Sequence, residues 1–425
     1  MKNLLEFLSA LAVLSLLLSA CGSRPSADVA RSTLDRVRDP AVPQADVAAL
    51  VKGNNGFALQ LYRSLHSEDG NLAFSPYSIS VALAMPYAGA RGDTAAQMAR
   101  TLHYTLPQDK LHPAFNRLDQ DLAKQAEPSS KDEHPLQLKI ANAVWAEKTF
   151  TFLQDYLDLI ARNYGAGVQL SDFVNNHEAV RQQINKWVSQ QTNDKIKDLI
   201  PQGALDAMTR MVLVNAIYFK ADWLQPFDPN DTSDAPFHLL DGSQVQTKMM
   251  SNQLSAPYAA GEGYQAVELA YSGETAAMDI IVPDDGRFAD FEAGLDAEKL
   301  DSVLGSLQPG TLELSMPKFT FRSSLELGDR LAAMGMADAF NADAADFSGM
   351  TGKRDLYISK VLHQAFIAVD EKGTEAAAAT AVIMRTTSAL VGPQKLVIDR
   401  PFIFVIRDLE SGQILFMGRV LDPTK

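Results

Sequence analysis

The stretch that most constrains the fold is residues 371–390, EKGTEAAAATAVIMRTTSAL, which lies between strand-like runs at 358–369 and 395–406. Its four consecutive alanines favour a helix, whereas the β-branched residues that follow them favour a strand. Gly373 allows a turn that other residues resist. Nothing bulky or doubly charged occurs in 376–383, so this part could enter a sheet without a steric or desolvation barrier. The alternative interpretation is an alanine-rich surface helix, and the stretch alone leaves both open.

The composition is that of a globular protein with an acidic surface. The chain has 425 residues, of which 46% are hydrophobic and 21% are charged, so it can bury a large core. Its formal net charge is -14. This charge argues against nucleic acid as a partner, because phosphates need Lys and Arg, and against a polybasic contact with a membrane surface.

The first residues form an export signal rather than part of the fold. Residues 4–18 are an apolar run too short to cross a bilayer comfortably. Residues 18–22, LSACG, look like a bacterial lipobox, and Cys21 is the only cysteine in the chain. Gly22 after that cysteine resembles lipoproteins sorted to the outer membrane. We therefore expect a lipid anchor on Cys21 in the bacterial cell envelope, at the periplasmic face or the cell surface. The alternative is an ordinary signal peptide with a coincidental cysteine.

The remaining sequence indicates one domain behind a linker. After the signal peptide at 1–20, residues 21–46 carry the lipidated cysteine and a stretch rich in Ser, Ala, Asp, Arg and Pro, which predicts a flexible tether. The domain is expected at 47–425, because no repeat and no second linker interrupts it. A lone cysteine leaves no partner for an internal disulfide, so stability must come from the core.

Apolar patterning predicts mostly helices early in the domain and mostly strands late. Residues 178–190 repeat apolar side chains with helical spacing, and 211–220 form a nearly continuous apolar run typical of an interior strand. Ser75 and Pro76 suit the start of a buried helix. Helices followed by strands favour an α+β domain over alternating βαβ units.

Signatures of enzymatic chemistry are absent from the sequence. It contains no HExxH, CxxC, GxSxG or GxxxxGK[ST] motif, and its seven histidines do not lie at metal-ligand spacing from one another. Acidic pairs such as Asp284-Asp285 read as solvated turns in so acidic a chain. The sequence therefore predicts no enzyme, no metal and no cofactor.

Six motifs in register nevertheless resemble one family, the serpins. They extend from about residue 48 to the end of the chain, and are found at 71–102, 214–220, 223–227, 314–319, 361–371 and 399–402. The resemblance implies an α+β fold with three β-sheets, eight or nine helices and an exposed reactive loop at about 371–393.

The resemblance also implies a function as an inhibitor of serine endopeptidases, with cysteine endopeptidases as a further target class. The protease cleaves the loop, forms an acyl-enzyme and is trapped when the loop inserts into the main sheet, the family mechanism of loop insertion. Family spacing places the scissile bond between Thr387 and Ser388, and the alternative is Arg385–Thr386. The protein would act as a monomer. The hinge that enters first would comprise Glu371, Gly373, Thr374, Glu375, Ala376, Ala377, Ala378, Ala379 and Thr380.

Family analogy assigns structural roles to further residues. A polar cluster where the strands part would comprise Ser75, Ser78, Asn215 and His363, Trp223 would cover the loop entry, and Lys318 would pair with Glu371. One departure is Pro86, inside the helix that follows Ser78, where a kink is expected at a cost of ~3 kcal/mol if unrelieved. The alternative function is a non-inhibitory binding or structural lipoprotein of the same fold, whose loop is merely cleaved. The small residues of the hinge favour the inhibitor.

Overall fold

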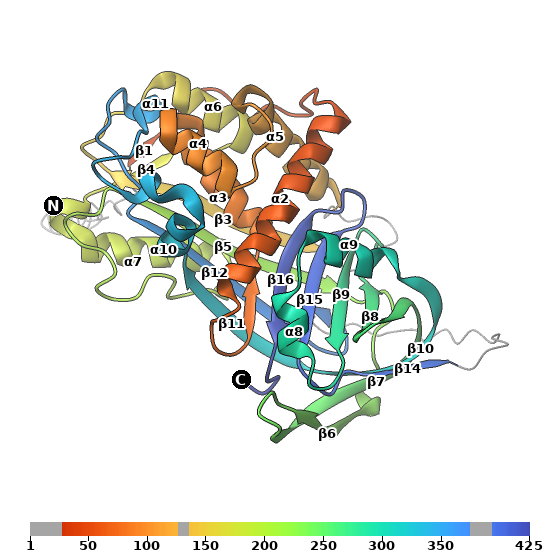
Figure 1. The fold of residues 1–425 in the computed structure, drawn as a ribbon. Coiled ribbons are helices and arrows are strands. Elements are labelled where there is room, and N and C mark those ends of the chain that lie inside the picture. Colours follow the sequence, from red (N-terminus) through yellow and green to blue (C-terminus); the bar gives the residue numbers. More distant parts are fainter. Residues whose placement is uncertain (1–27, 126–135, 375–392) are drawn as a thin grey trace, which may run out of the picture.

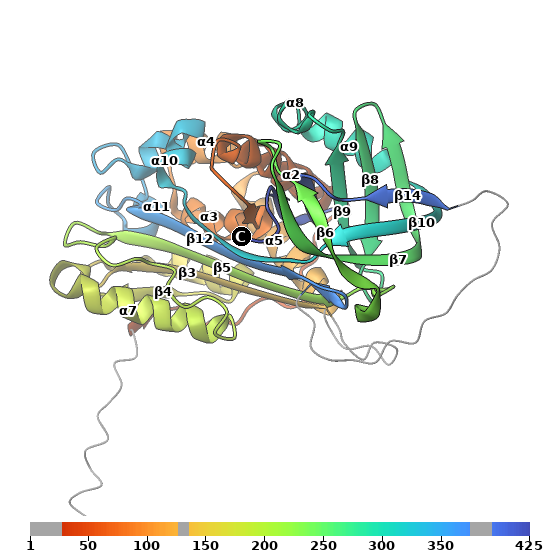
Figure 2. The same ribbon diagram turned by 90° about the horizontal axis from the view of Figure 1, so that it is seen from below.

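The computed structural model describes residues 28–125, 136–374 and 393–425. Most helices lie on one face of a long seven-stranded sheet, and α7 (Phe173–Gln191) covers the opposite face (Figures 1 and 2). Two apolar cores follow from this layering, a large one under the helices and a smaller one between α7 and the sheet. The expected α+β class is confirmed.

The helices number ten in the described part of the chain, rather than the eight or nine expected. The difference comes from short segments: Phe288–Ala293 and Ala297–Gly305 are separate helices on either side of Gly294, and two further helices have four residues each. Besides α7 they are α2 (Gln44–Leu65), α3 (Pro76–Gly89), α4 (Gly92–Thr101), α5 (Gln108–Gln125), α6 (Gln154–Tyr164), α8 (Phe288–Ala293), α9 (Ala297–Gly305), α10 (Gly328–Leu331) and α11 (Ser348–Thr351).

The seven-stranded sheet is built around the predicted interior strand. In spatial order it contains β1 (Asp28–Ala30), β4 (Val168–Ser171), β3 (Gln137–Glu147), β5 (Met211–Asp222), β13 (Gly373–Thr374), β12 (Lys360–Val369) and β11 (Phe319–Glu326). Strand β5 is buried along almost its whole length. This burial on both faces explains why its sequence is continuously apolar.

The other strands form a single nine-stranded sheet, so the expected three sheets are two in the described residues. They are joined because the long strand β7 pairs with β6, β10 and β8 in turn. The strands are β14 (Gln394–Val397), β10 (Gln308–Pro317), β7 (Gln244–Gly261), β8 (Tyr264–Ala270), β9 (Ala276–Pro283), β15 (Phe402–Asp408), β16 (Ile414–Val420), β2 (Leu72–Phe74) and β6 (Thr232–His238).

Helix α3 starts as expected and tolerates its proline. Ser75 caps it, accepting a hydrogen bond on Oγ from the backbone N of Ser78 at 3.2 Å. The helix is continuous through Pro86 to Gly89, so the proline lies in the last turn. It therefore removes one backbone hydrogen bond close to the helix end, where a kink displaces little of the helix.

The flexible tether predicted at 21–46 is wrong from residue 28 onward. Strand β1 pairs antiparallel with β4, and the backbone N of Val37 donates to the carbonyl of Arg162 at 2.8 Å. Arg36 forms an ion pair with Asp119 on α5 at 2.7 Å. Composition could not reveal this docking, because the segment has no periodicity and its partners are distant in sequence.

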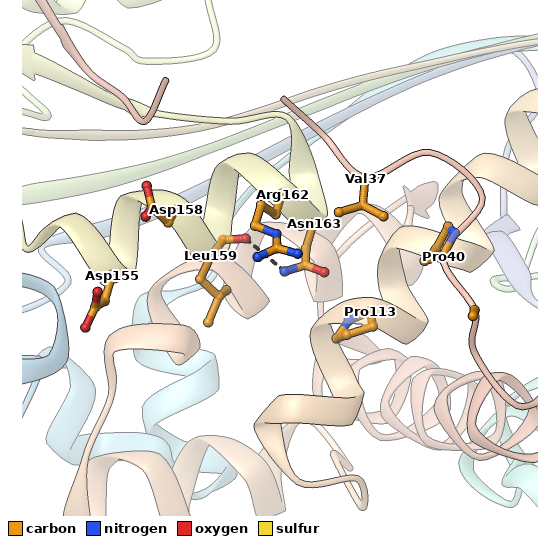
Figure 3. A pocket seen from close by; sticks show the side chains of 9 residues that line it. Val37, Pro40, Pro113, Asp155, Asp158, Leu159, Arg162 and Asn163 are labelled. Atoms are coloured by element: carbon orange, nitrogen blue, oxygen red, sulfur yellow. Dashed lines mark hydrogen bonds between the residues drawn. The ribbon is translucent and has the colours of Figure 1, made fainter. Parts of the chain in front are cut away.

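The docked N-terminal segment borders a surface cavity of about 490 Å³. Figure 3 shows Val37 and Pro40 of this segment facing Pro113 of α5 and Leu159 and Asn163 of α6. A dashed line there marks the 2.9 Å bond from the side chain of Asn163 to the carbonyl of Leu159. The segment thus lies along the helices α5 and α6 before α2 begins at Gln44. Across the described ranges, no helix combines the length and the apolar character needed to span a bilayer.

Candidate functional site at the parting of two strands

The central strands β5 and β12 pair directly over only part of their length. They are hydrogen-bonded in parallel from Val212 with Lys360 to Tyr218 with Phe366. Beyond this, the two residues of β13 lie between them, pairing with Asp222 and Ala221 of β5 and with Val369 of β12. The start of the predicted hinge is therefore already a strand of the sheet.

The two residues of β13 suit a narrow space. A Cβ atom on Gly373 would lie 2.1 Å from the carbonyl oxygen of Ala221, so only glycine fits there. Thr374 is fully buried, and its hydroxyl lies 2.7 Å from that of Tyr271. A small side chain with one satisfied polar group can be buried at this entry, whereas a large or charged one cannot.

Trp223 holds the turn that leads into β13. Its ring stacks on Tyr271 with centroids 4.7 Å apart and planes 8° apart. Its backbone N donates to the carbonyl of Lys372 at 2.7 Å, and its indole N donates to the carbonyl of Asp370 at 3.0 Å. The structure therefore places Trp223 at the loop entry, where family analogy puts it.

Lys318 and Glu371 meet at the base of the loop. The Lys318 ammonium lies 2.7 Å from one carboxylate oxygen of Glu371, and the hydroxyl of Thr232 donates to the other at 2.8 Å. Burial raises the pKa of Glu371, but the hydrogen bonds from Lys318, the backbone and Thr232 outweigh it and leave the pKa below its usual value. The carboxylate thus stays charged and fastens the loop base to β6 and to the β10–β11 corner.

A buried polar cluster, which we call the shutter cluster, lies where β5 and β12 are still paired. Asn215 of β5 is the register partner of both His363 on β12 and Asn142 on β3. The side-chain amide of Asn215 donates to the hydroxyl of Ser78 and to the side-chain oxygen of Asn142. Ser75 and Ser78 are presented from below by the first turn of α3.

The hydrogen bonds define the protonation of His363. The backbone N of Ser75 donates to Nε2 at 3.2 Å, so Nδ1 carries the proton and donates to Asn215 Oδ1. Complete burial lowers the pKa of His363 to about 3. The histidine is therefore neutral, and it joins β5, β12 and α3 through a hydrogen-bond network without a charge.

Asn142 is the member of the shutter cluster that the sequence interpretation missed. Its side-chain oxygen accepts a hydrogen bond from the Ser78 hydroxyl at 3.5 Å, and its side-chain nitrogen donates to the Ser78 carbonyl at 3.3 Å. A signal was present, because it stands between Ala141 and Ala143 in an otherwise apolar stretch of strand. A polar residue within such a stretch indicates a buried hydrogen-bond partner.

Several predicted site residues lie outside the described residues. They are Cys21, Glu375, Ala376, Ala377, Ala378, Ala379, Thr380, Arg385, Thr386, Thr387 and Ser388. Within the described ranges, 28–125, 136–374 and 393–425, no group of three metal-ligating side chains occurs.

Comparison with known proteins agrees with the geometry. The serpin (serine protease inhibitor) family model matches residues 52–423. This chain belongs to the serpin family. Serpins are protease inhibitors and not enzymes, which agrees with the absence of catalytic motifs.

Relatives of this serpin occur in organisms as different as Thermococcus kodakarensis and Homo sapiens. An uncharacterised serpin-like protein of Thermococcus kodakarensis is 37% identical over 394 residues, which cover 92% of this chain and 90% of the relative. The leukocyte elastase inhibitor of Homo sapiens is 39% identical over 387 residues, 88% of this chain and 99% of the inhibitor. The native-state structure of tengpin, a thermophilic serpin, superposes with a TM-score of 0.81 at 26% identity, covering 93% of this chain and 100% of tengpin.

Proposed function

We propose that this serpin inhibits serine endopeptidases, and cysteine endopeptidases as a second class, by trapping them after cleavage of its loop. The observation that carries the proposal is β13, a strand of two residues already held between β5 and β12. Residues that follow Thr374 would extend this strand by separating β5 from β12. The relation to leukocyte elastase inhibitors supports an elastase-like target.

The register of β13 supports a definite path for an inserting loop. Gly373 pairs with Asp222 and Thr374 with Ala221, so each further residue moves one position back along β5. Thr380 would then lie opposite Asn215 on one side and, by the β12 register, opposite His363 on the other. Insertion would thus end the direct pairing of Asn215 with His363 and would place a threonine between them.

The alternation of side chains fits the same path. Thr374 faces the buried hydroxyl of Tyr271, and residues 376, 378 and 380 would share its face. These are small (Ala, Ala, Thr), as a buried face requires. About a dozen inserted residues, at ~0.5–1.5 kcal/mol net per hydrogen bond, would supply on the order of 10 kcal/mol. That gain would make the uncleaved form metastable and the trapped complex persistent.

A protease panel tests the proposal. The full chain is incubated with elastase-like, papain-like and trypsin-like enzymes, and adducts are examined by denaturing electrophoresis and mass spectrometry. We expect a covalent adduct in which the chain ends at Thr387, since a small β-branched residue suits elastase-like enzymes. Cleavage after Arg385 would shorten the inserted strand and favour turnover. Cleaved monomer with every enzyme, and no adduct, would instead support a non-inhibitory binding protein.

We further propose that Cys21 is acylated and holds the domain at a bacterial membrane in the cell envelope, most simply the outer membrane. Support comes from the LSACG sequence and from Cys21 being the only cysteine. Intact-mass analysis of the membrane fraction tests this, because acylation adds the mass of the acyl chains and cleavage of the signal peptide before Cys21 removes residues 1–20. A soluble mature chain that starts elsewhere and carries no lipid would contradict it.

A further inference from the structure

The N-terminal segment leaves the fold at one defined end of the seven-stranded sheet. Asp28 pairs with Leu170, which pairs with Ala146, which in turn pairs with Met211, the first residue of β5. The hinge pairs with Asp222, the last residue of β5. Eleven residues of strand separate these positions, a distance of roughly 36 Å at ~3.3 Å per residue. The end at Met211 is therefore the pole opposite the loop entry, and we call it the distal pole.

Of the six large hydrophobic side chains that are exposed in the described part of the chain, three lie at this distal pole. They are Leu153, Val174 and Met208, and Met208 is 65% exposed. Each belongs to a segment that enters or leaves the sheet at this end. Val174 is the second residue of α7 and lies three residues after β4, Met208 lies three residues before β5, and Leu153 lies six residues after β3. In Figures 1 and 2, the helices α7, α10 and α11 lie toward the side of the molecule away from β6 and β14.

Hydrogen bonds fix the backbone around these three residues, and the backbone N of Leu153 donates to the carbonyl of Met350 at 2.8 Å. The backbone N of Val174 donates to the carboxylate of Glu147 at the end of β3, and the backbone N of Glu147 donates to the carbonyl of Arg210. The carbonyl of Met208 accepts a bond from the hydroxyl of Tyr357 at 2.8 Å. The three apolar side chains are thus exposed on segments whose backbone is held in place. Exposed apolar side chains gathered on one end indicate an interaction surface.

We propose that the distal pole is a membrane-docking face, on which Leu153, Val174 and Met208 enter the lipid interface. The occupant follows from chain length. Seven Cα–Cα steps separate Cys21 from Asp28, so an acylated Cys21 lies at most about 25 Å from the start of β1. This reach is shorter than the sheet, so the anchor holds the distal pole toward the bilayer and the loop entry away from it. Apolar side chains on a surface held this close can enter the acyl boundary.

The docking face also has a consequence for the trapping of a protease, and this consequence rests on the proposed function. If the β13 register continues, residue 387 arrives opposite Met208 when the loop is fully inserted. The acylated protease would then reach the distal pole. A protease domain of about 230 residues has a radius of gyration of roughly 17 Å, too large to fit beneath a docked pole. Trapping must therefore lift the pole from the membrane.

A pair of matched labels tests the docking. The acylated full chain is reconstituted into phosphatidylethanolamine–phosphatidylglycerol vesicles, and a fluorophore is attached at Leu153→Cys or at Leu224→Cys. Both leucines are 42% exposed, and Leu224 lies at the opposite pole, directly after Trp223. Since Cys21 is blocked by its lipid, each label is unique. We expect nitroxide-bearing lipids to quench the label at 153 several-fold more than the label at 224.

Second-site variants and vesicle flotation make the outcome unambiguous. Met208→Glu should reduce the quenching at 153 several-fold, whereas Leu240→Glu, on the β6–β7 hairpin, should not. Flotation with equal quenching at both labels would overturn the docking while leaving the anchor intact. Absence of flotation would overturn both. Self-association through the pole, seen as label–label energy transfer without lipid quenching, would also overturn it.

The adduct provides the last outcome. Adding an elastase-like protease should abolish the quenching at 153 in step with the adduct seen by electrophoresis. An adduct that forms with quenching unchanged would overturn the docking but not the inhibition. Quenching that persists with only cleaved monomer would support docking and contradict inhibition.

Discussion

The pair of strands β5 and β12 differs between its two ends, and the difference shows how far the sheet is open. At the Asp222 end, β13 separates the strands, and the space is lined by the stacked rings of Trp223 and Tyr271. At Asn215 and His363 the strands are directly paired and fastened by hydrogen bonds. The sheet is therefore open at the loop entry and closed at the shutter cluster.

The two regions close the sheet by different physical means. The loop entry selects by size, because position 373 has no room for a Cβ atom and Thr374 is fully buried. The shutter cluster selects by hydrogen bonding, because its buried groups cannot lose partners without a desolvation cost. Variants in the first region should therefore block insertion, and variants in the second should release it.

The largest effect is expected for Thr374→Arg, which would place an unpaired charge in a fully buried position. Such a charge costs several kcal/mol. Each 1.4 kcal/mol changes the ratio of trapped to merely cleaved product about tenfold. We expect the fraction of protease trapped to fall at least tenfold, with cleaved monomer in its place. Thr374→Ser is the matched control and should trap normally. Circular dichroism checks that the arginine variant is folded, and normal trapping by that folded variant would refute entry through β13.

A smaller effect in the opposite direction is expected for Asn215→Ala. The substitution leaves His363 Nδ1–H without its acceptor and removes the amide donor to Ser78 and Asn142, at a cost of roughly 1–3 kcal/mol. We expect faster spontaneous loss of inhibitory activity at 37 °C, as the sheet opens without cleavage. Asn54→Ala, which removes a buried asparagine of α2 bonded to Gln413 and Ser80, is the control. Equal acceleration by both variants would mean that the shutter cluster has no special role.

The pH dependence distinguishes the neutral shutter cluster from the charged loop base. Burial lowers the pKa of His363 to about 3, below the value of about 6.5 expected in the unfolded chain. The unfolded state therefore binds the extra proton, and stability falls as pH decreases from 6.5 toward 3, by at most ~1.4 kcal/mol per pH unit. His112 is lowered to about 3 in the same way. The free energy of unfolding, measured by chemical denaturation from pH 4 to 7, should therefore change less with pH in His363→Gln than in the wild type.

Asp279 makes an opposing contribution to the pH dependence of stability. The comparison of wild type with His363→Gln removes this contribution. Burial raises the pKa of Asp279 to about 7, against an attraction from Arg407 that lowers it. Its folded state binds the extra proton, so this contribution to stability is lost as pH rises from about 4 to 7. It is common to the wild type and His363→Gln, so it cancels in their difference. An unchanged slope in the variant would show that His363 is charged in the folded protein.

The smallest effect is expected for Lys318→Met at the loop base. The lysine side chain is 37% exposed and Glu371 is held by Thr232 as well, so loss of the ion pair should cost less than about 1 kcal/mol. The folded pKa of Glu371 is lowered, so its contribution is present at neutral pH and lost as pH falls through acid values. Denaturant midpoints of Lys318→Met and wild type should therefore converge at low pH. A cost above 3 kcal/mol would place the ion pair among the main determinants of closure.

Local patterns in the sequence predicted the elements whose burial is uniform. The apolar run of β5, the helical face of α7 and the cap at Ser75 all report burial that is continuous along the chain. What could not be predicted depends on contacts between distant segments. The docking of β1, the sharing of β7 by two groups of strands and the hydrogen bonds of Asn142 are of this kind.

The candidate site divides in the same way. Family resemblance nominated Trp223, Lys318, Glu371 and the four shutter residues, and the structure places them at two positions along one strand pair. The partial entry of Gly373 and Thr374 was not predictable, because small residues fit a turn, a helix or a sheet equally well. Only the geometry of Ala221 and Tyr271 shows that the sheet receives them.

The most direct test is a crystal structure of this serpin after cleavage between Thr387 and Ser388. We predict a new strand that continues β13 between β5 and β12, with Thr380 opposite both Asn215 and His363. A cleaved structure in which Asn215 and His363 remain direct partners, with β13 still two residues long, would contradict inhibition by loop insertion.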